Sequence, residues 1–416
     1  ADDCVAIGAN ALLAVTTGVK NIAIGSYALD ATTTGANNVA LGHNAGTAII
    51  GGASNVLIGT GSGLLLTDNN YNIAIGHSAL AGANTGEHNN IAIGLNALYT
   101  ETTGADGCVA IGGSALMDQN VASANNTAVG HNAATNLSSG TNSVYMGYLA
   151  GGAGVITGGY NVAVGVNAAK NGIGFSYSTF IGANAGGGGN LAGTSNTCVG
   201  YAAGYDLVGG HSNTLVGRNA GQNFTNNNYN VAIGLDALGA ANAGEAYNIA
   251  IGTNALTAET SGANYCVAIG HNALTAQDAD VKNTAIGGLA GDAIAGGTNN
   301  TAVGYAAVSD ACGNNNTGVG HLAFVKGTGT NNTVIGAKAG SSVETTGTAM
   351  SGNDNVLVGF AAGKTLTTGP GNVLIGKDAG LAMSTGDYNV AIGVAAADAL
   401  TGDSDYNIAI GVNALG

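Results

Sequence analysis

Histidine is the first residue type in this chain that could do chemistry, by holding a metal ion or moving a proton. The 416-residue sequence has seven, and five directly follow the glycine of a recurring Val-Ala-Ile-Gly-like motif: His43, His77, His131, His271 and His321. A metal site needs several ligands close together, but no two of these five lie in consecutive copies of the motif. We therefore expect exposed surface histidines rather than a metal site.

Acidic and glycine-rich segments are the next candidates. The aspartates between the motif copies could bind Ca²⁺ weakly, but the RTX nonapeptide that would make such a site strong is missing. They include Asp2, Asp3, Asp68, Asp206, Asp403 and Asp405. The glycine runs at 151–154 and 186–189 resemble phosphate loops, but no Lys-Ser/Thr pair follows them. We expect no enzyme, and no catalytic, metal-binding or cofactor-binding residue.

Six Asn-x-Ser/Thr sequons could accept a glycan. Two of them, Asn136 and Asn223, lie between motif copies and are the candidate glycosylation sites. The other four are by-products of Asn-Asn-Thr runs at Asn125, Asn299, Asn315 and Asn331.

The elements that position all of these residues are 24 copies of the motif. Its glycine recurs at 8, 25, 42, 59, 76, 94, 112, 130, 147, 165, 182, 200, 217, 234, 252, 270, 287, 304, 320, 336, 359, 376, 393 and 411. Of the 23 intervals, twelve are 17 residues, eight are 18, two are 16 and one is 23. Such a period predicts an all-β parallel β-solenoid of 24 coils, forming one continuous domain over residues 1–416.

The positions of each copy, numbered from this glycine as position 0, predict its local structure. Position −3 is Val or Ile in 16 copies and Thr in eight, and position −1 is always Ile, Val, Leu or Met. These residues favour a strand, and residues two apart share a face. The glycine suits a sharp corner with positive φ, and Ala at position +3 in 23 copies suits a cramped one. Each copy is predicted as strand, tight turn, short apolar segment and polar return.

Position −4 is Asn in 19 copies, Cys in three and Ser in two. Stacked Asn side chains can hydrogen-bond from coil to coil, as polar ladders do in stacked parallel sheets. The alternative is that Asn only tolerates a turn conformation there. We favour the ladder, because Cys is a poor turn residue and fits a small buried slot.

The cysteines are not predicted to form disulfides. The sequence has five, an odd number, namely Cys4, Cys108, Cys198, Cys266 and Cys312. With coils stacked about 4.8 Å apart, even the closer pairs lie at or beyond the ~7 Å limit for a bridge. We expect small buried side chains.

Position −2 is the most informative column. It holds 15 Ala and four Leu, with Tyr145, Phe180, Cys198, Gly318 and Val334 in the remaining copies. We assign positions −3 and −1 to the core and position −2 to the outward face. An outward face in water should be polar, so other chains must cover this one. We infer lateral self-association, most simply around a three-fold axis. The same assignment places the position −3 threonines toward the core, which argues against ice binding.

The pattern N-[VIT]-A-[IV]-G-x-N-A-[LG] resembles the head repeats of trimeric autotransporter adhesins and similar arrays in phage tail fibres, for example at 21–25 and 407–411. The resemblance implies a trimeric, left-handed parallel β-roll with the VAI strands lining the trimer interior. It also implies an extracellular fibre or adhesive role. The copies here are longer than the usual adhesin repeat. Because Ile-Gly-x-Asn-Ala-Leu also fits one hexapeptide of a left-handed β-helix, a triangular single-chain helix stays open.

Charge and hydropathy exclude several partners. The net charge of −15, from 23 acids and 8 bases, argues against nucleic acid and an anionic membrane surface. No run of about 18 apolar residues exists to insert into a membrane. With 45% apolar residues and a single Pro, the chain fits neither a disordered segment nor collagen.

The sequence thus predicts an extracellular structural or adhesive fibre protein on a cell or virion surface. Its partners would be copies of itself, as a trimer or stacked end to end in a filament through uncapped strand edges, and surface glycans. The alternative is a phage receptor-binding tail fibre or another carbohydrate-binding module. The long return at 341–354 could carry binding, or it could be a tolerated surface loop.

Overall fold

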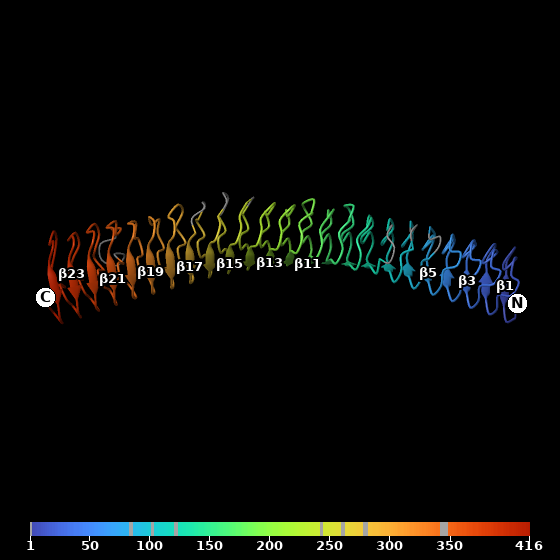
Figure 1. Cartoon of the computed structure of the whole chain (residues 1–416), viewed down its shortest axis with the longest axis horizontal. Coiled ribbons are helices and arrows are strands. Elements are labelled where there is room, and N and C mark those ends of the chain that lie inside the picture. Colours follow the sequence, from blue (N-terminus) through green and yellow to red (C-terminus); the bar gives the residue numbers. More distant parts are fainter. Residues whose placement is uncertain are drawn as a thin grey trace. The chain divides into compact units, whose positions relative to one another are not determined.

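The computed structural model describes residues 2–82, 86–100, 104–119, 124–241, 244–258, 263–277, 282–341 and 348–416. This part of the chain is all-β, a parallel β-solenoid of 24 strands without a helix (Figure 1). Accordingly, no helix in these residues is long and apolar enough to cross a bilayer. The chain divides into two compact units, Ala1–His211 and Ser212–Gly416.

The first unit contains twelve strands of three residues. They are β1 (Val5–Ile7), β2 (Ile22–Ile24), β3 (Val39–Leu41), β4 (Val56–Ile58), β5 (Ile73–Ile75), β6 (Ile91–Ile93), β7 (Val109–Ile111), β8 (Thr127–Val129), β9 (Val144–Met146), β10 (Val162–Val164), β11 (Thr179–Ile181) and β12 (Thr197–Val199). Consecutive strands pair in parallel, so that Ala23 pairs with Ala6 on one side and Ala40 on the other.

The second unit also contains twelve strands. They are β13 (Thr214–Val216), β14 (Val231–Ile233), β15 (Ile249–Ile251), β16 (Val267–Ile269), β17 (Thr284–Ile286), β18 (Thr301–Val303), β19 (Thr317–Val319), β20 (Thr333–Ile335), β21 (Val356–Val358), β22 (Val373–Ile375), β23 (Val390–Ile392) and β24 (Ile408–Ile410). The irregular intervals keep the register: Val334 pairs with Gly318 and with Leu357. Residues 342–347 of the long return lie outside the described part.

Every strand occupies positions −3 to −1 of its copy, as predicted. Each coil therefore has one strand, and the described residues add only four isolated bridges outside these strands, such as that between Leu137 and Ile156. A triangular β-helix would carry a sheet on each of three sides. The solenoid has a sheet on one side only, so that alternative is wrong.

The glycine at position 0 forms the predicted corner. Gly94 has φ 137°, and a Cβ placed on it would lie 2.5 Å from the carbonyl oxygen of Gly112 in the next coil. The turn is closed by the amide of Ala97, which donates to the Gly94 carbonyl at 3.4 Å. Positions +2 and +4 are also left-handed, as Asn96 (φ 52°) and Leu98 (φ 50°) show. Only a residue without a side chain fits position 0.

The prediction that placed position −2 on the outward face is wrong. From Ala23 to Ala409, the side chains at this position are at most 2% exposed and form the core. The flanking positions −3 and −1 are half-buried or exposed from β2 to β24. Because the interior of a coil is narrow, it accepts a small strand residue, and the larger β-branched residues point outward.

Position +4 lies opposite position −2 in the core, and the two compensate in volume. Each large residue at position −2 has Gly at position +4 of its own coil. The pairs are Leu57/Gly63, Tyr145/Gly151, Phe180/Gly186, Cys198/Gly204, Leu215/Gly221, Val334/Gly340, Leu357/Gly363 and Leu374/Gly380. One coil has the reverse arrangement, with Gly318 facing Phe324. This exchange helps to keep the interior close-packed where one of the two residues is large, whereas five coils, such as that of Ala40 and Gly46, have a small residue at both positions.

Candidate functional site

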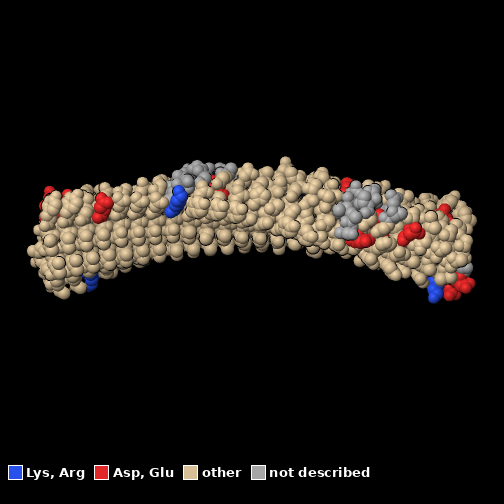
Figure 2. All heavy atoms as spheres, in the orientation of Figure 1, with Lys and Arg blue, Asp and Glu red and all other residues tan. Residues whose placement is uncertain are grey.

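The outward side of the strands forms an uncharged, mostly apolar surface in each unit. We call it the strand face and define it as positions −3 and −1 of every coil. Its side chains remain accessible: Ile111 is 37% exposed and Ile286 is 40% exposed. No charged residue occurs between positions −4 and 0 in any copy. In the view of Figure 2, acids and bases are few, and most of the visible surface is uncharged. The strand face can therefore contact another surface without desolvating a charge.

The threonines of position −3 lie on this strand face, contrary to the sequence prediction. Thr284, Thr301, Thr317 and Thr333 do so in four consecutive coils, each half-buried. These threonines are therefore not kept from ice by a core location. Position −1, however, is never Thr. The strand face thus lacks rows of threonines spaced two residues apart.

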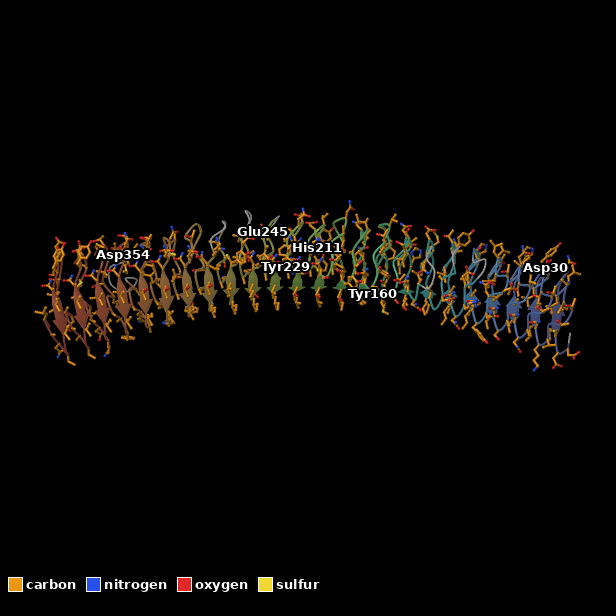
Figure 3. All side chains as sticks on the ribbon, viewed as in Figure 1. Asp30, Tyr160, His211, Tyr229, Glu245 and Asp354 are labelled. Atoms are coloured by element: carbon orange, nitrogen blue, oxygen red, sulfur yellow. The ribbon has the colours of Figure 1, made fainter. Side chains whose placement is uncertain are left out.

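Tyrosines flank the strand face at position −5, where all copies have positive φ. Tyrosine occupies this position in eight copies: Tyr71, Tyr160, Tyr177, Tyr229, Tyr247, Tyr265, Tyr388 and Tyr406. In neighbouring coils the rings stack, with 5.0 Å between the centroids of Tyr229 and Tyr247 and of Tyr247 and Tyr265. Figure 3 labels Tyr160 and Tyr229 among the side chains. These rings contact each other through their faces and leave their edges exposed.

Position +1 flanks the strand face on its other side and carries the five predicted histidines. All five are exposed, as expected. Some stack on an aromatic ring of the next coil, such as His131 on Tyr148 with 6.0 Å between centroids. Among the described residues, no group of three or more His, Cys, Asp or Glu side chains is placed to hold a metal ion.

The aspartates of the returns accept hydrogen bonds from the preceding coil. Asp68 Oδ1 accepts from the Gly51 amide at 3.1 Å, and Asp405 Oδ1 accepts from the Asp387 amide at 2.8 Å. Their carboxylates thus contribute to coil stacking. The candidate glycosylation sites, Asn136 and Asn223, are half-buried, and their modification stays a prediction.

Position −4 forms the predicted ladder inside each unit. Asn372 accepts at Oδ1 from the Asn389 amide (2.9 Å) and donates through Nδ2 to the Gly386 carbonyl (2.8 Å). It also donates to Asn355 Oδ1 in the preceding coil (3.1 Å). The turn alternative is wrong, because the residue with positive φ is at position −5. The ladder satisfies strand amides and return carbonyls that are buried from water.

Replacing Asn372 with Ala is expected to lower the free energy of unfolding by about 2–3 kcal/mol, since two buried backbone groups lose a partner. These are the Asn389 amide and the Gly386 carbonyl. Chemical unfolding followed by circular dichroism would measure the loss. Asn372→Ser is the matched control, because Ser178 Oγ accepts from the next coil's amide at 3.1 Å. Equal losses for Ala and Ser would contradict the ladder's role.

The five cysteines all lie in the described residues, and none forms a disulfide. The absence of disulfides agrees with the sequence prediction, and four of the five side chains are buried as expected, whereas Cys4 is only half-buried. Burial raises the pKa of Cys198 far above its usual value, and burial is also the main cause that raises the pKa of Cys312 to about 12. Both are therefore neutral thiols at physiological pH, without the thiolate character that makes a cysteine reactive.

Two buried carboxylates were not predicted. Glu87 and Glu245 are 0% exposed, and each accepts from an Asn Nδ2 of the preceding return, Asn69 and Asn227 respectively. Glu87 also accepts from the Gly104 amide at 3.2 Å. Hydrogen bonds of this kind make a buried carboxylate tolerable.

Two buried Cys-Gln contacts were also not predicted. Gln119 Nε2 lies 3.1 Å from Cys108 Sγ, and Gln277 Nε2 lies 2.8 Å from Cys266 Sγ. The sequence does contain a signal for both kinds of site, because residues 67–119 align without a gap on residues 225–277. This second, longer-range repeat places the same buried polar residues in both units.

Searches of protein-family models and of curated proteins found no match to the chain. The fold is compatible with the repeat arrays that the sequence resembles.

Proposed function

We propose that this chain is a structural fibre protein of a cell or virion surface whose copies associate laterally, as a trimer, through the strand face. The observation that carries the proposal is the pair of uncharged outward residues in every coil, of which position −1 is always apolar and position −3 is apolar in 16 copies and Thr in eight. Exposed apolar surfaces that extend over many elements mark interaction sites in proteins. The outward residues at positions −3 and −1 are larger than the alanines of position −2, so they offer more surface to a partner.

The size of the strand face supports a stable interface. Twelve strands at about 4.8 Å spacing make a strip about 55 Å long, and positions −3 to −1 make it about 10 Å wide. Each unit therefore offers about 550 Å², and the two units of one chain together offer about 1,100 Å², above the ~800 Å² that each partner buries in a standard interface.

Charge and periodicity favour a second copy of the chain as the occupant. Two chains with a net charge of −15 each repel one another over most of their surfaces. The strand face is the part of each coil where this repulsion is weakest. A partner also has to match the strand spacing over many coils. Another copy of the chain does so because it has the same coils.

The adhesive part of the proposal concerns the columns beside the strand face. Exposed tyrosines at position −5 and aromatic residues at position +1 offer ring edges and hydroxyl groups that suit surface glycans. A phage receptor-binding fibre would use the same surfaces. The adhesive role and the receptor-binding role both follow from the resemblance of the repeat to adhesin heads and phage tail fibres. We also propose that chains stack end to end into a filament.

Lysines on the strand face are expected to abolish lateral association. The test variant is Ile93→Lys/Ile233→Lys, with one charge in each unit. Light scattering after size exclusion should give about three times 39.8 kDa for the unmodified chain and 39.8 kDa for the variant. A charge buried without a partner in an apolar interface costs several kcal/mol, and the two sites recur in every copy.

The matched control is Leu95→Lys/Leu235→Lys, which adds the same charges to the same coils at position +1. That column already contains Arg218 and Lys377, so this variant should associate as the unmodified chain does. Circular dichroism verifies that both variants fold. A monomeric unmodified chain at high concentration, or an Ile93→Lys/Ile233→Lys variant that still associates, would refute lateral association through the strand face.

A further inference from the structure

The two Cys-Gln contacts in the core place a thiol beside a carboxamide in each unit. Both cysteines and both glutamines are 0% exposed. Since an amide carbon is one bond of about 1.33 Å from its nitrogen, Gln119 Cδ lies within about 4.5 Å of Cys108 Sγ. The Gln277 contact is closer, with 2.8 Å between Nε2 and Cys266 Sγ.

Glutamine and cysteine are both rare in this chain, yet they occur together in these two contacts. The chain has three glutamines and five cysteines, and two of the glutamines lie against two of the cysteines. In both pairs the glutamine is eleven residues after the cysteine. Cys4 occupies the same ladder position in its coil but has Val15 at the corresponding place, so it serves as an internal comparison.

A ladder asparagine holds the carbonyl oxygen of each glutamine. Asn126 Nδ2 donates to Gln119 Oε1 at 3.1 Å, and Asn283 Nδ2 donates to Gln277 Oε1 at 3.1 Å. The same Asn126 Nδ2 also donates to the Gly140 carbonyl at 2.8 Å, which fixes its position. A fixed donor at this oxygen polarises the carbonyl and stabilises the negative charge that develops there when a nucleophile attacks.

We propose that each pair forms an internal thioester between the cysteine and glutamine side chains. Cysteine Sγ attacks Gln Cδ, the Sγ–Cδ bond forms and the Cδ–Nε2 bond breaks. The thiol proton moves to the adjacent Nε2, which leaves as ammonia with the two hydrogens it already carries. No oxidant or reductant is consumed, and both reacting groups come from the chain itself.

Proximity and burial favour this step and protect its product. Two groups held in contact react with an effective concentration far above that of separate molecules. The surrounding core excludes water, so the thioester is shielded from hydrolysis. Each bond would join the ladder column to the return of the same coil and close it covalently across its interior.

Intact-mass spectrometry of the full chain, denatured in acid, tests the proposal. Two thioesters lower the mass by about 34 Da, since each loses one ammonia of about 17 Da. Thiol titration in denaturant should then give three thiols instead of the five in the sequence. Methylamine added after unfolding should open each thioester, restore the thiol and leave a methylamide on the glutamine.

Cysteine variants show which pair forms each thioester. Cys108→Ala and Cys266→Ala should each retain one ammonia loss, and the double variant should have the mass of its sequence. Cys198→Ala is the control, because Cys198 is also buried but has no glutamine beside it, and both losses should persist. Loss of one ammonia in the unmodified chain would support the thioester at the pair whose variant abolishes it. A mass equal to that of the sequence, together with five titrating thiols, would overturn the proposal.

Discussion

Replacing the corner glycine Gly287 with alanine is expected to lower the free energy of unfolding by about 5 kcal/mol. A Cβ at this position would lie 2.5 Å from the Gly304 carbonyl oxygen and 2.6 Å from its carbon. The φ of 139° is itself costly for any residue with a side chain. Because the clashing atoms are backbone, relief requires the two coils to separate, which disrupts strand pairing between β17 and β18. Chemical unfolding would measure the loss.

The control for this prediction is Gly411→Ala. Gly411 has a similar φ of 127°, but the nearest atom to its Cβ would be Ala414 Cβ at 4.0 Å. This variant isolates the conformational cost of positive φ, about 1–3 kcal/mol, from the steric cost. Hydrogen exchange at β17 and β18 should rise in Gly287→Ala. If the two variants lost equal stability, close stacking of the corners would not be the reason for glycine at position 0.

The strands and corners could be predicted because their causes are local. β-branched residues at position −3, an aliphatic residue at −1 and glycine at 0 favour one conformation whatever surrounds them. The asparagine ladder was predictable for a related reason. Once coils stack in register, identical side chains at position −4 must meet, and an amide can donate and accept along the stack.

The orientation of the strand could not be predicted from its polarity. Usually the polar residues of a strand mark the outward face, but here position −1 is always apolar and position −3 is polar only in the eight copies that carry Thr. The volume exchange between positions −2 and +4 does indicate which strand residue points into the core. Leu57 with Gly63 and Ala92 with Leu98 have nearly equal summed volumes, as expected for two side chains that fill one cavity. The narrow interior then selects alanine at position −2.

The buried polar groups could not be predicted from the motif. Glu87 and Gln119 belong to the variable returns, and which return residue turns inward depends on the length and packing of each return. A charged or amide side chain in a polar return is ordinarily exposed. Only the repetition of the same residues in 67–119 and 225–277 distinguishes these positions, and it does not by itself reveal that they are buried.

In the coil that contains β22, the volume exchange predicts that two destabilising substitutions compensate each other. Leu374→Ala should cost about 3 kcal/mol through the cavity it leaves. Gly380→Leu should cost about as much, because its Cβ would already lie 2.7 Å from Leu374 Cδ1. The double variant Leu374→Ala/Gly380→Leu should lose less than about 1.5 kcal/mol, since it recreates the Ala-Leu pair of coils such as that of Ala92 and Leu98.

The backbone permits this exchange. Gly380 has φ 62°, and Leu98 adopts φ 50° at the same position of its own coil, so a leucine is tolerated at position +4. Chemical unfolding of the four proteins gives the coupling energy directly. Additive losses of about 6 kcal/mol in the double variant would mean that positions −2 and +4 do not share one cavity. The assignment of position −2 to the core would then lose its energetic basis, and with it the argument that the strand face is the surface available to a second chain.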